Sequence, residues 1–204
     1  MPVDVVALLW ACASRPLDPE HGMGDGGLVL MRPEGTFLAV VDGIGHGGPA
    51  EAAARAALEL LRQLAGPDLS GTLIRCHDAL KATRGATMGL AWVNRVTATL
   101  SWLGVGNVSG VLHPNGSKRR ASAPYMPQFG GVVGRRLRPL EPSTVPIEPG
   151  DTIVLATDGL RRAVLGDAPP ARWSESAFAE RLVETHANGQ DDAYVLVARV
   201  AEDA

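Results

Sequence analysis

Short apolar segments rich in β-branched residues recur along the chain. Residues 36–41 and 151–156 form nearly continuous apolar runs, and another run covers 193–200. Runs of this length between turn residues are typical of buried strands. The expected strands are 3–13, 27–31, 36–41, 86–93, 99–105, 109–112, 151–156 and 193–200.

Two helical patterns lie next to each other in the middle of the chain. The first begins at Pro49, a residue suited to the first turn of a helix. The second covers about 69–83, and a third covers about 174–187 with Ser174 as its expected N-cap. The expected inward face of the first helix is Ala50, Ala54, Ala57, Leu61 and Leu64.

The order of these elements predicts the fold class. Turn residues at 94–97 and at 106–107 favour antiparallel pairing of the strands on either side. The chain then runs from strands to two helices, more strands, a helix and a last strand, which is not a strict βαβα alternation. We therefore expect one α+β domain over 1–204, with antiparallel sheets covered by helices.

Composition narrows the function classes. A net charge of −3 and an aromatic content of 4% give no reason to expect nucleic-acid binding. No stretch reaches the ~18 apolar residues of a membrane span, and the N-terminus lacks the basic region of a signal peptide. Cys12 and Cys76 have no metal-ligand spacing and are expected to be reduced. We expect a soluble, cytoplasmic protein with no nucleic-acid or membrane partner.

The segment FLAVVDGIGHGG, residues 37–48, offers several interpretations. Gly43, Gly45 and Gly48 match the G-x-G-x-x-G fingerprint of dinucleotide-binding domains. That interpretation is disfavoured, because a second helix follows where a parallel strand is needed and because Asp42 would repel a pyrophosphate. A simple Asp-Gly turn remains open as a local explanation.

Aspartates recur at the ends of expected strands. Asp42 ends one apolar run, Asp158 follows another, Asp25 precedes a third, and Asp191 precedes the last. Carboxylates from separate strands can converge at one rim of a sheet, where they raise each other's pKa unless a cation neutralises them. Oxygen ligands favour Mg²⁺ or Mn²⁺, and Gly43 lacks a Cβ, so its carbonyl can approach a metal closely. Such a set suits two cations about 3.5–4 Å apart, an arrangement that hydrolyses phosphate esters.

The motifs VVDGIGHGG, ATDGL and DDAYVLVAR, preceded by an earlier GD, resemble the metal-dependent protein phosphatases related to protein phosphatase 2C. Within these they are most similar to the bacterial SpoIIE/RsbX type. The resemblance implies a four-layer α-β-β-α sandwich of two antiparallel sheets, a binuclear Mn²⁺ or Mg²⁺ centre, and hydrolysis of phosphoserine or phosphothreonine on proteins.

The resemblance also assigns roles to the aspartates. Asp42 would bridge the two metals and the Gly43 carbonyl would bind one of them. Asp25, Asp158 and Asp191 would complete the ligand set. Asp191 matches the family pattern D-[DN]-x-x-V as its first residue, which leaves Asp192 secondary.

The chain departs from the animal members of the family in two places. Their histidine directly after Asp-Gly is replaced by His46, in the GxGHG form of the bacterial branch, as either a general acid or a residue that shapes the loop. Their phosphate-binding arginine before the first acidic motif is absent, and His21 is the nearest base. Arg161 or Arg162 could line the phosphate site instead.

The expected partners also follow from the resemblance. They are phosphorylated STAS-domain proteins of a stress-signalling complex such as the stressosome, or a free anti-anti-sigma factor. A catalytically inactive phosphatase-fold binding module is the alternative of a different class. The basic clusters 118–120 and 135–138 are solvated loops or help to dock an acidic phosphoprotein, and the segment 124–134 could move over the cleft as a substrate flap.

Overall fold

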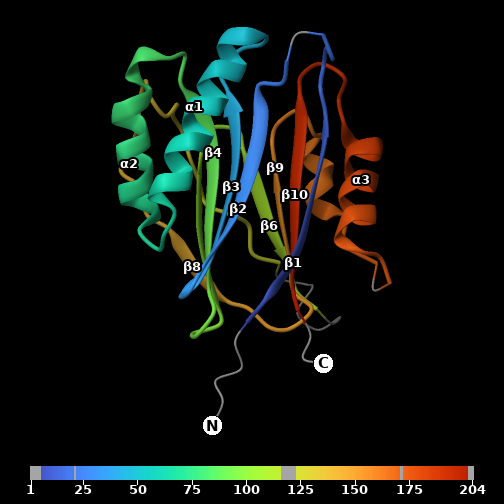
Figure 1. Ribbon diagram of the computed structural model, residues 1–204. Helices are drawn as coiled ribbons and strands as arrows, with labels where there is room; N and C mark the ends of the chain where they lie inside the picture. Colours follow the sequence, from blue (N-terminus) through green and yellow to red (C-terminus); the bar gives the residue numbers. More distant parts are fainter. Residues whose placement is uncertain (1–5, 21, 116–122, 171, 202–204) are drawn as a thin grey trace.

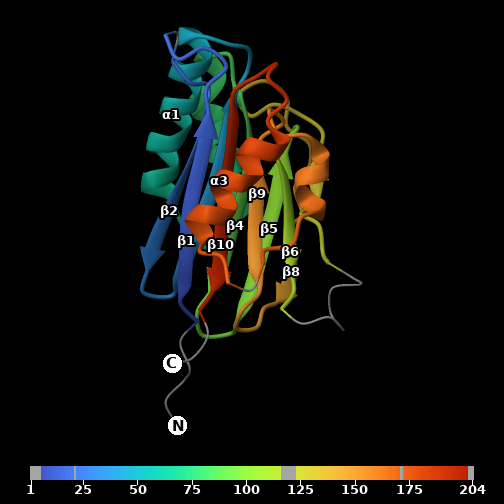
Figure 2. The ribbon, with the colours of Figure 1, turned by 90° about the vertical axis from the view of Figure 1, so that its right-hand side faces the viewer.

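The computed structural model describes residues 6–20, 22–115, 123–170 and 172–201. Two sheets pack face to face, and helices cover the outer face of each (Figures 1 and 2). The strands are β1 (Leu8–Arg15), β2 (Asp25–Arg32), β3 (Gly35–Gly43), β4 (Ala86–Asn94), β5 (Thr99–Val105), β6 (Ser109–His113), β7 (Gln128–Phe129), β8 (Ser143–Pro146), β9 (Thr152–Ala156) and β10 (Ala193–Val200). The helices are α1 (Gly48–Leu64), α2 (Leu69–Ala79) and α3 (Glu175–His186), with short 3-10 helices η1 (Leu80–Ala82) and η3 (Arg162–Gly166).

The predicted α-β-β-α sandwich is confirmed. One sheet has the order β1-β10-β9-β6 and carries α3, and the other has the order β2-β3-β4-β5-β7 and carries α1 and α2. All pairings are antiparallel except the short parallel contact of β5 with β7. No helix in the described part of the chain is long and apolar enough to cross a membrane.

The packing of β3 on both of its faces explains its nearly continuous apolar sequence. Phe37, Ala39 and Val41 face the cluster beneath α1 and α2, whereas Leu38 and Val40 face the other sheet. Because both faces of β3 are covered, the alternation of a half-exposed strand is absent and every residue of β3 is buried. The strand therefore carries its terminal aspartate into the interior of the molecule.

Two expectations about strand pairing have different outcomes. The turn at 94–97 joins β4 and β5 as an antiparallel pair, as predicted. The turn at 106–107 does not join paired strands, because the chain crosses there into the other sheet and β6 pairs with β9. Gly106 has a φ of 89° and lies against Thr87, so the glycine serves a tight crossover rather than a hairpin.

Two short strands lie outside the set expected from the sequence. β8 pairs antiparallel with β5, and β7, within the segment 124–134, pairs parallel with β5. Proline is compatible with such edge strands. The segment 124–134 is fastened rather than loose, because Met126 donates a backbone hydrogen bond to Gly110 and Gly104 donates one to Pro127.

Helix boundaries largely follow the sequence. Pro49 lies in the first turn of α1, and four of the five expected inward residues are buried, while Leu64 is half-buried. The second helix is an α-helix to Ala79 and continues as η1 to Ala82, close to the predicted range of about 69–83. Cys12 and Cys76 are free thiols, as expected.

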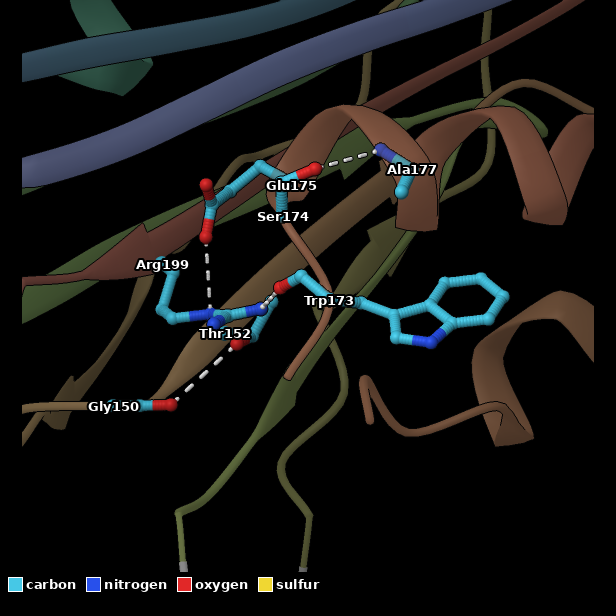
Figure 3. A network of polar contacts seen from close by, with 7 residues as sticks. All are labelled: Gly150, Thr152, Trp173, Ser174, Glu175, Ala177 and Arg199. Carbon is cyan, nitrogen blue, oxygen red and sulfur yellow. Dashed lines mark hydrogen bonds and ion pairs between the residues drawn. The ribbon is translucent and has the colours of Figure 1, made fainter. Parts of the chain in front are cut away.

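The start of α3 is held to β10 by a polar network (Figure 3). Ser174 accepts a hydrogen bond of 3.2 Å from the Ala177 amide, which confirms the predicted N-cap. Arg199 pairs with Glu175 at 3.1 Å and donates to the Trp173 carbonyl at 2.9 Å. The Arg199 and Glu175 side chains are only 19% and 14% exposed, so the Glu175 carboxylate largely depends on Arg199 for its polar contacts.

Arg199→Met should destabilise the protein by about 1–3 kcal/mol, because it leaves the poorly hydrated Glu175 carboxylate without its partner. Urea denaturation measures this change. The matched control is Lys81→Met, which breaks the exposed Lys81–Asp78 pair and should cost under about 1 kcal/mol. Equal losses in the two variants would contradict a role for the Arg199–Glu175 pair in holding α3.

Candidate metal centre

The aspartates border strand ends along one rim of the sandwich, and in Figure 1 β2 and β10 begin and β3 ends at the upper end of the view. Asp25 opens β2 and Asp42 lies near the end of β3, directly opposite it in the antiparallel register. Asp158 follows the end of β9 and Asp191 precedes the start of the neighbouring strand β10. Each sheet therefore contributes two of the four predicted side chains.

These carboxylates are close enough to influence one another. Asp158 and Asp191 both raise the pKa of Asp42, and Asp42 raises the pKa of Asp25. In the part of the chain that the structure describes, no three acidic, histidine or cysteine side chains already form a metal cage.

Asp25 is the most strongly perturbed member of the group. Burial, followed by the negative charge of Asp42, raises its pKa to about 9. Its Oδ2 is buried and has no hydrogen-bond partner among the described residues. A buried acceptor of this kind must either carry a proton or face a cation, because an unpaired buried charge is costly.

The pKa of Asp42 is also raised by burial and by neighbouring carboxylates, but less strongly than that of Asp25. Asp42 is 8% exposed, and burial raises its pKa to about 7 with further contributions from Asp158 and Asp191. The Thr87 hydroxyl, on the neighbouring strand β4, lies 3.3 Å from Asp42 Oδ2 and lowers this pKa. Asn107 lowers this pKa as well, but two neutral groups do not balance several negative charges.

Asn107 is a site residue that the sequence interpretation missed. Its Oδ1 accepts a hydrogen bond of 2.5 Å from Thr87, and its Nδ2 donates one of 2.5 Å to Asp158 Oδ2. This chain of contacts joins Asp42, on one sheet, to Asp158, beside the other. The Gly106-Asn107 pair was interpreted only as a turn, and the partner of Asn107 becomes visible only once β9 is in place.

The neighbouring residues Asp191 and Asp192 differ in their hydrogen bonds and in their burial. The two oxygens of Asp192 accept hydrogen bonds from the amides of Gly24, at 2.6 Å, and Leu17, at 2.7 Å. Asp192 is buried and holds the segment before β2 in place. Asp191 is only half-buried, and burial together with Asp158 and Asp192 raises its pKa despite one backbone hydrogen bond. This difference supports the choice of Asp191 as the metal ligand.

Asp192→Asn should lower the stability of the metal-free protein by about 1–3 kcal/mol, because an amide NH₂ would replace one of two acceptors that face backbone N–H groups. Asp191→Asn should leave stability nearly unchanged and weaken Mn²⁺ binding instead. Thermal denaturation and calorimetric titration with Mn²⁺ separate the two effects. The assignment of roles would be wrong if Asp192→Asn lost Mn²⁺ affinity with no loss of stability.

Packing against the first turn of α1 requires a glycine at position 43. A Cβ at this position would overlap the carbonyl oxygen of Ala50 in the first turn of α1. The Gly43 amide donates to the Gly24 carbonyl at 2.9 Å, so the position also joins the segments that carry Asp25 and Asp42. Its carbonyl as a metal ligand stays a prediction.

His46 is exposed and lies at the same rim. It lines a pocket of about 320 Å³ together with Asp18, Asp191 and Asp192. Its positive form lies close enough to lower the pKa of Asp191. The position is compatible with a general acid, and that role stays a prediction.

Only some of the basic residues proposed to contact the phosphate or to dock the substrate lie in the described part of the chain. His21 and the cluster 118–120 lie outside the described residues. Arg135, from the cluster 135–138, donates to the carbonyls of Thr83 and Arg84 and so has a structural task. Arg161 and Arg162 line a second pocket, of about 360 Å³, which also includes Asp158.

The rim fits hard divalent cations. Its donors are carboxylate oxygens, and the pKa values of Asp25, Asp42 and Asp191 are all raised. Oxygen-rich sites of this kind select Mg²⁺ or Mn²⁺ over softer metals. The buried Asp25 Oδ2 is the clearest sign, since no donor among the described residues satisfies it.

Comparison with known proteins agrees with this geometry. The family described as stage II sporulation protein E (SpoIIE) matches residues 32–202. Phosphoserine phosphatase RsbX of Bacillus subtilis (strain 168) is 28% identical over 138 residues, which cover 67% of each chain.

Solved structures share the whole fold. A structure from work on the bacterial stressosome as a modular system has a TM-score of 0.85 at 26% identity and covers 95% of this chain and 100% of its own. RsbX in complex with magnesium has a TM-score of 0.79 at 22% identity and covers 96% and 98%. The match over residues 32–202 means that the chain belongs to the SpoIIE family, and its fold is that of the PP2C phosphatase domain of SpoIIE.

Proposed function

We propose that this protein removes phosphate from serine or threonine of a protein substrate, with Mn²⁺ or Mg²⁺ in a binuclear centre. Asp25, Asp42, Asp158 and Asp191 would hold the cations, together with the Gly43 carbonyl. The observation that carries this proposal is the facing pair Asp25 and Asp42, whose pKa values are raised by burial and then by neighbouring carboxylates, while no cationic side chain among the described residues lowers either value. Both sheets supply ligands, so we also propose that 1–204 acts as one domain.

The chain's own residues prepare the reaction in distinct ways. When bound, the cations supply Lewis acidity to the phosphate and to the attacking water. Asn107 fixes the orientation of Asp158, and Thr87 links it to Asp42. Asp192 holds the segment that leads into Asp25. His46, which lines the same pocket as Asp191, would give a proton to the departing serine or threonine oxygen.

The substrate that we propose is a phosphorylated STAS-domain protein of a stressosome-type complex in the cytoplasm. Support comes from the similarity to phosphoserine phosphatase RsbX and to a structure from work on the bacterial stressosome. A free anti-anti-sigma factor is the second candidate. An inactive binding module is less consistent with the molecule, because the complete aspartate set is kept at the rim.

The direct test is phosphate release from a phosphorylated STAS-domain protein and from a phosphorylated anti-anti-sigma factor, with Mn²⁺, with Mg²⁺ and with EDTA. We expect turnover that needs the cation and that favours the stressosome protein. Mn²⁺ binding without turnover of either protein would instead support the binding module.

A further inference from the structure

Two of the pockets that include rim aspartates differ in the charge of their other lining residues. The pocket beside His46 is lined by Asp18, Asp191 and Asp192, and so is acidic. The other pocket includes Asp158 and is lined by Arg161 and Arg162. A polypeptide whose phosphoserine lies at the rim would therefore meet negative charge at one pocket and positive charge at the other.

The two arginines are free to bind an anion. Both side chains are exposed, and neither has a carboxylate partner among the residues that the structure describes. The backbone beneath them is fixed, because the Arg161 amide donates to the His186 carbonyl at 2.9 Å and the Val164 amide donates to the Arg161 carbonyl at 2.9 Å. The guanidinium groups are thus carried by an ordered backbone beside Asp158.

The floor of this pocket offers a further donor. Gln128 donates to the Val108 carbonyl at 2.7 Å and to Ser109 Oγ at 3.0 Å. Because Ser109 acts as the acceptor in that contact, its own hydroxyl proton remains for another acceptor. Two guanidinium groups and a hydroxyl are a suitable set for carboxylates.

We propose that this arginine pocket, formed by Arg161, Arg162 and Ser109, binds the carboxylates of acidic residues next to the phosphoserine of the substrate. The inference rests on the proposed phosphatase function and names its substrate class, an acidic phosphopeptide segment. The same acidic residues would be repelled from the pocket beside His46. Acidic residues on one side of the phosphoserine therefore fix the direction in which the peptide crosses the rim.

The test uses three phosphoserine peptides that differ only in their flanks: glutamates before the phosphoserine, glutamates after it, or glutamines on both sides. We expect wild-type kcat/KM to be roughly three- to tenfold higher for one of the glutamate peptides than for the glutamine peptide. Arg161→Gln/Arg162→Gln should bring this ratio close to one. Added salt should reduce the wild-type ratio, since the arginines are exposed to solvent.

The glutamine peptide is the internal reference, because a loss of activity common to all peptides cancels in the ratio. The matched control is Arg181→Gln, which removes an exposed arginine on α3 outside both pockets and should keep the wild-type ratio. An unchanged ratio in the double variant, or no preference in the wild-type protein, would overturn the proposal.

A binding measurement separates this inference from the proposed function. If wild-type protein hydrolyses none of the peptides, the phosphatase function fails. The arginine pocket is then judged by fluorescence anisotropy of the same peptides with Asp42→Asn protein, with and without the Arg161 and Arg162 substitutions. Affinity for the glutamate peptide that falls with the arginine substitutions supports the pocket, and unchanged affinity rejects it.

Discussion

Asp42→Asn should lower phosphatase activity by more than about 100-fold and raise the melting temperature of the metal-free protein. Loss of groups that merely orient metal ligands costs about 10- to 100-fold, so loss of a bridging ligand should exceed that range. The stability should rise because a neutral amide ends the repulsion that Asp42 shares with Asp25, Asp158 and Asp191. Each kcal/mol of relief corresponds to roughly 2–4 °C in a domain of this size.

The matched control for Asp42→Asn is Asp78→Asn. Asp78 lies on the exposed face of α2 in a pair with Lys81, so its replacement should leave both activity and melting temperature nearly unchanged. Steady-state hydrolysis with Mn²⁺ and calorimetry in EDTA give the two readouts. Full activity of Asp42→Asn would remove the proposed bridging ligand.

The metal-free protein should become less stable as the pH rises from about 4 to about 9. In the folded state the pKa of Asp25 is raised to about 9 and that of Asp42 to about 7, whereas both return to an ordinary value of 3.8 on unfolding. Within this window the folded state binds more protons than the unfolded state, so each increase in pH favours unfolding. The loss should be steepest below pH 7, where both groups contribute, and should end above pH 9.

Differential scanning calorimetry in EDTA from pH 5 to pH 9 measures this trend, and we expect the melting temperature to fall by more than about 5 °C. Saturating Mg²⁺ should remove most of the fall, because cations stabilise the ionised carboxylates. Asp42→Asn in EDTA should show a shallower decline than the wild-type protein. A melting temperature that rose with pH in EDTA would contradict the raised pKa values of Asp25 and Asp42 in the folded state.

The local sequence was sufficient to predict the strands whose ends carry the four aspartates. The buried run that ends in Asp42 and the aspartates beside other strands predicted a shared acidic rim, and the structure places Asp25, Asp42, Asp158 and Asp191 there. This worked because a strand buried on both faces has a distinct composition, and because side chains at strand ends gather at the edge of a sheet.

The features that were missed depend on contacts between distant segments. The Gly106-Asn107 turn looks the same in sequence whether the next strand pairs with β5 or crosses to β9, so neither the crossover nor the Asn107–Asp158 hydrogen bond could be foreseen. The short strands β7 and β8 form only because β5 offers an unpaired edge. The choice of Asp191 over Asp192 came from a family motif. The hydrogen bonds of Asp192 to the amides of Gly24 and Leu17, which distinguish the two residues physically, are visible only in the structure.

The pairing of β1 with β10 has a practical consequence for studying this molecule. Leu8 lies opposite Val200, whereas Arg15 lies opposite Ala193, so the outer ends of both strands point away from the acidic rim (Figure 1). The strand ends at Leu8 and Val200 therefore lie a full strand length from the aspartates. Labels can therefore be attached there to follow docking of bulky phosphoproteins without blocking their approach.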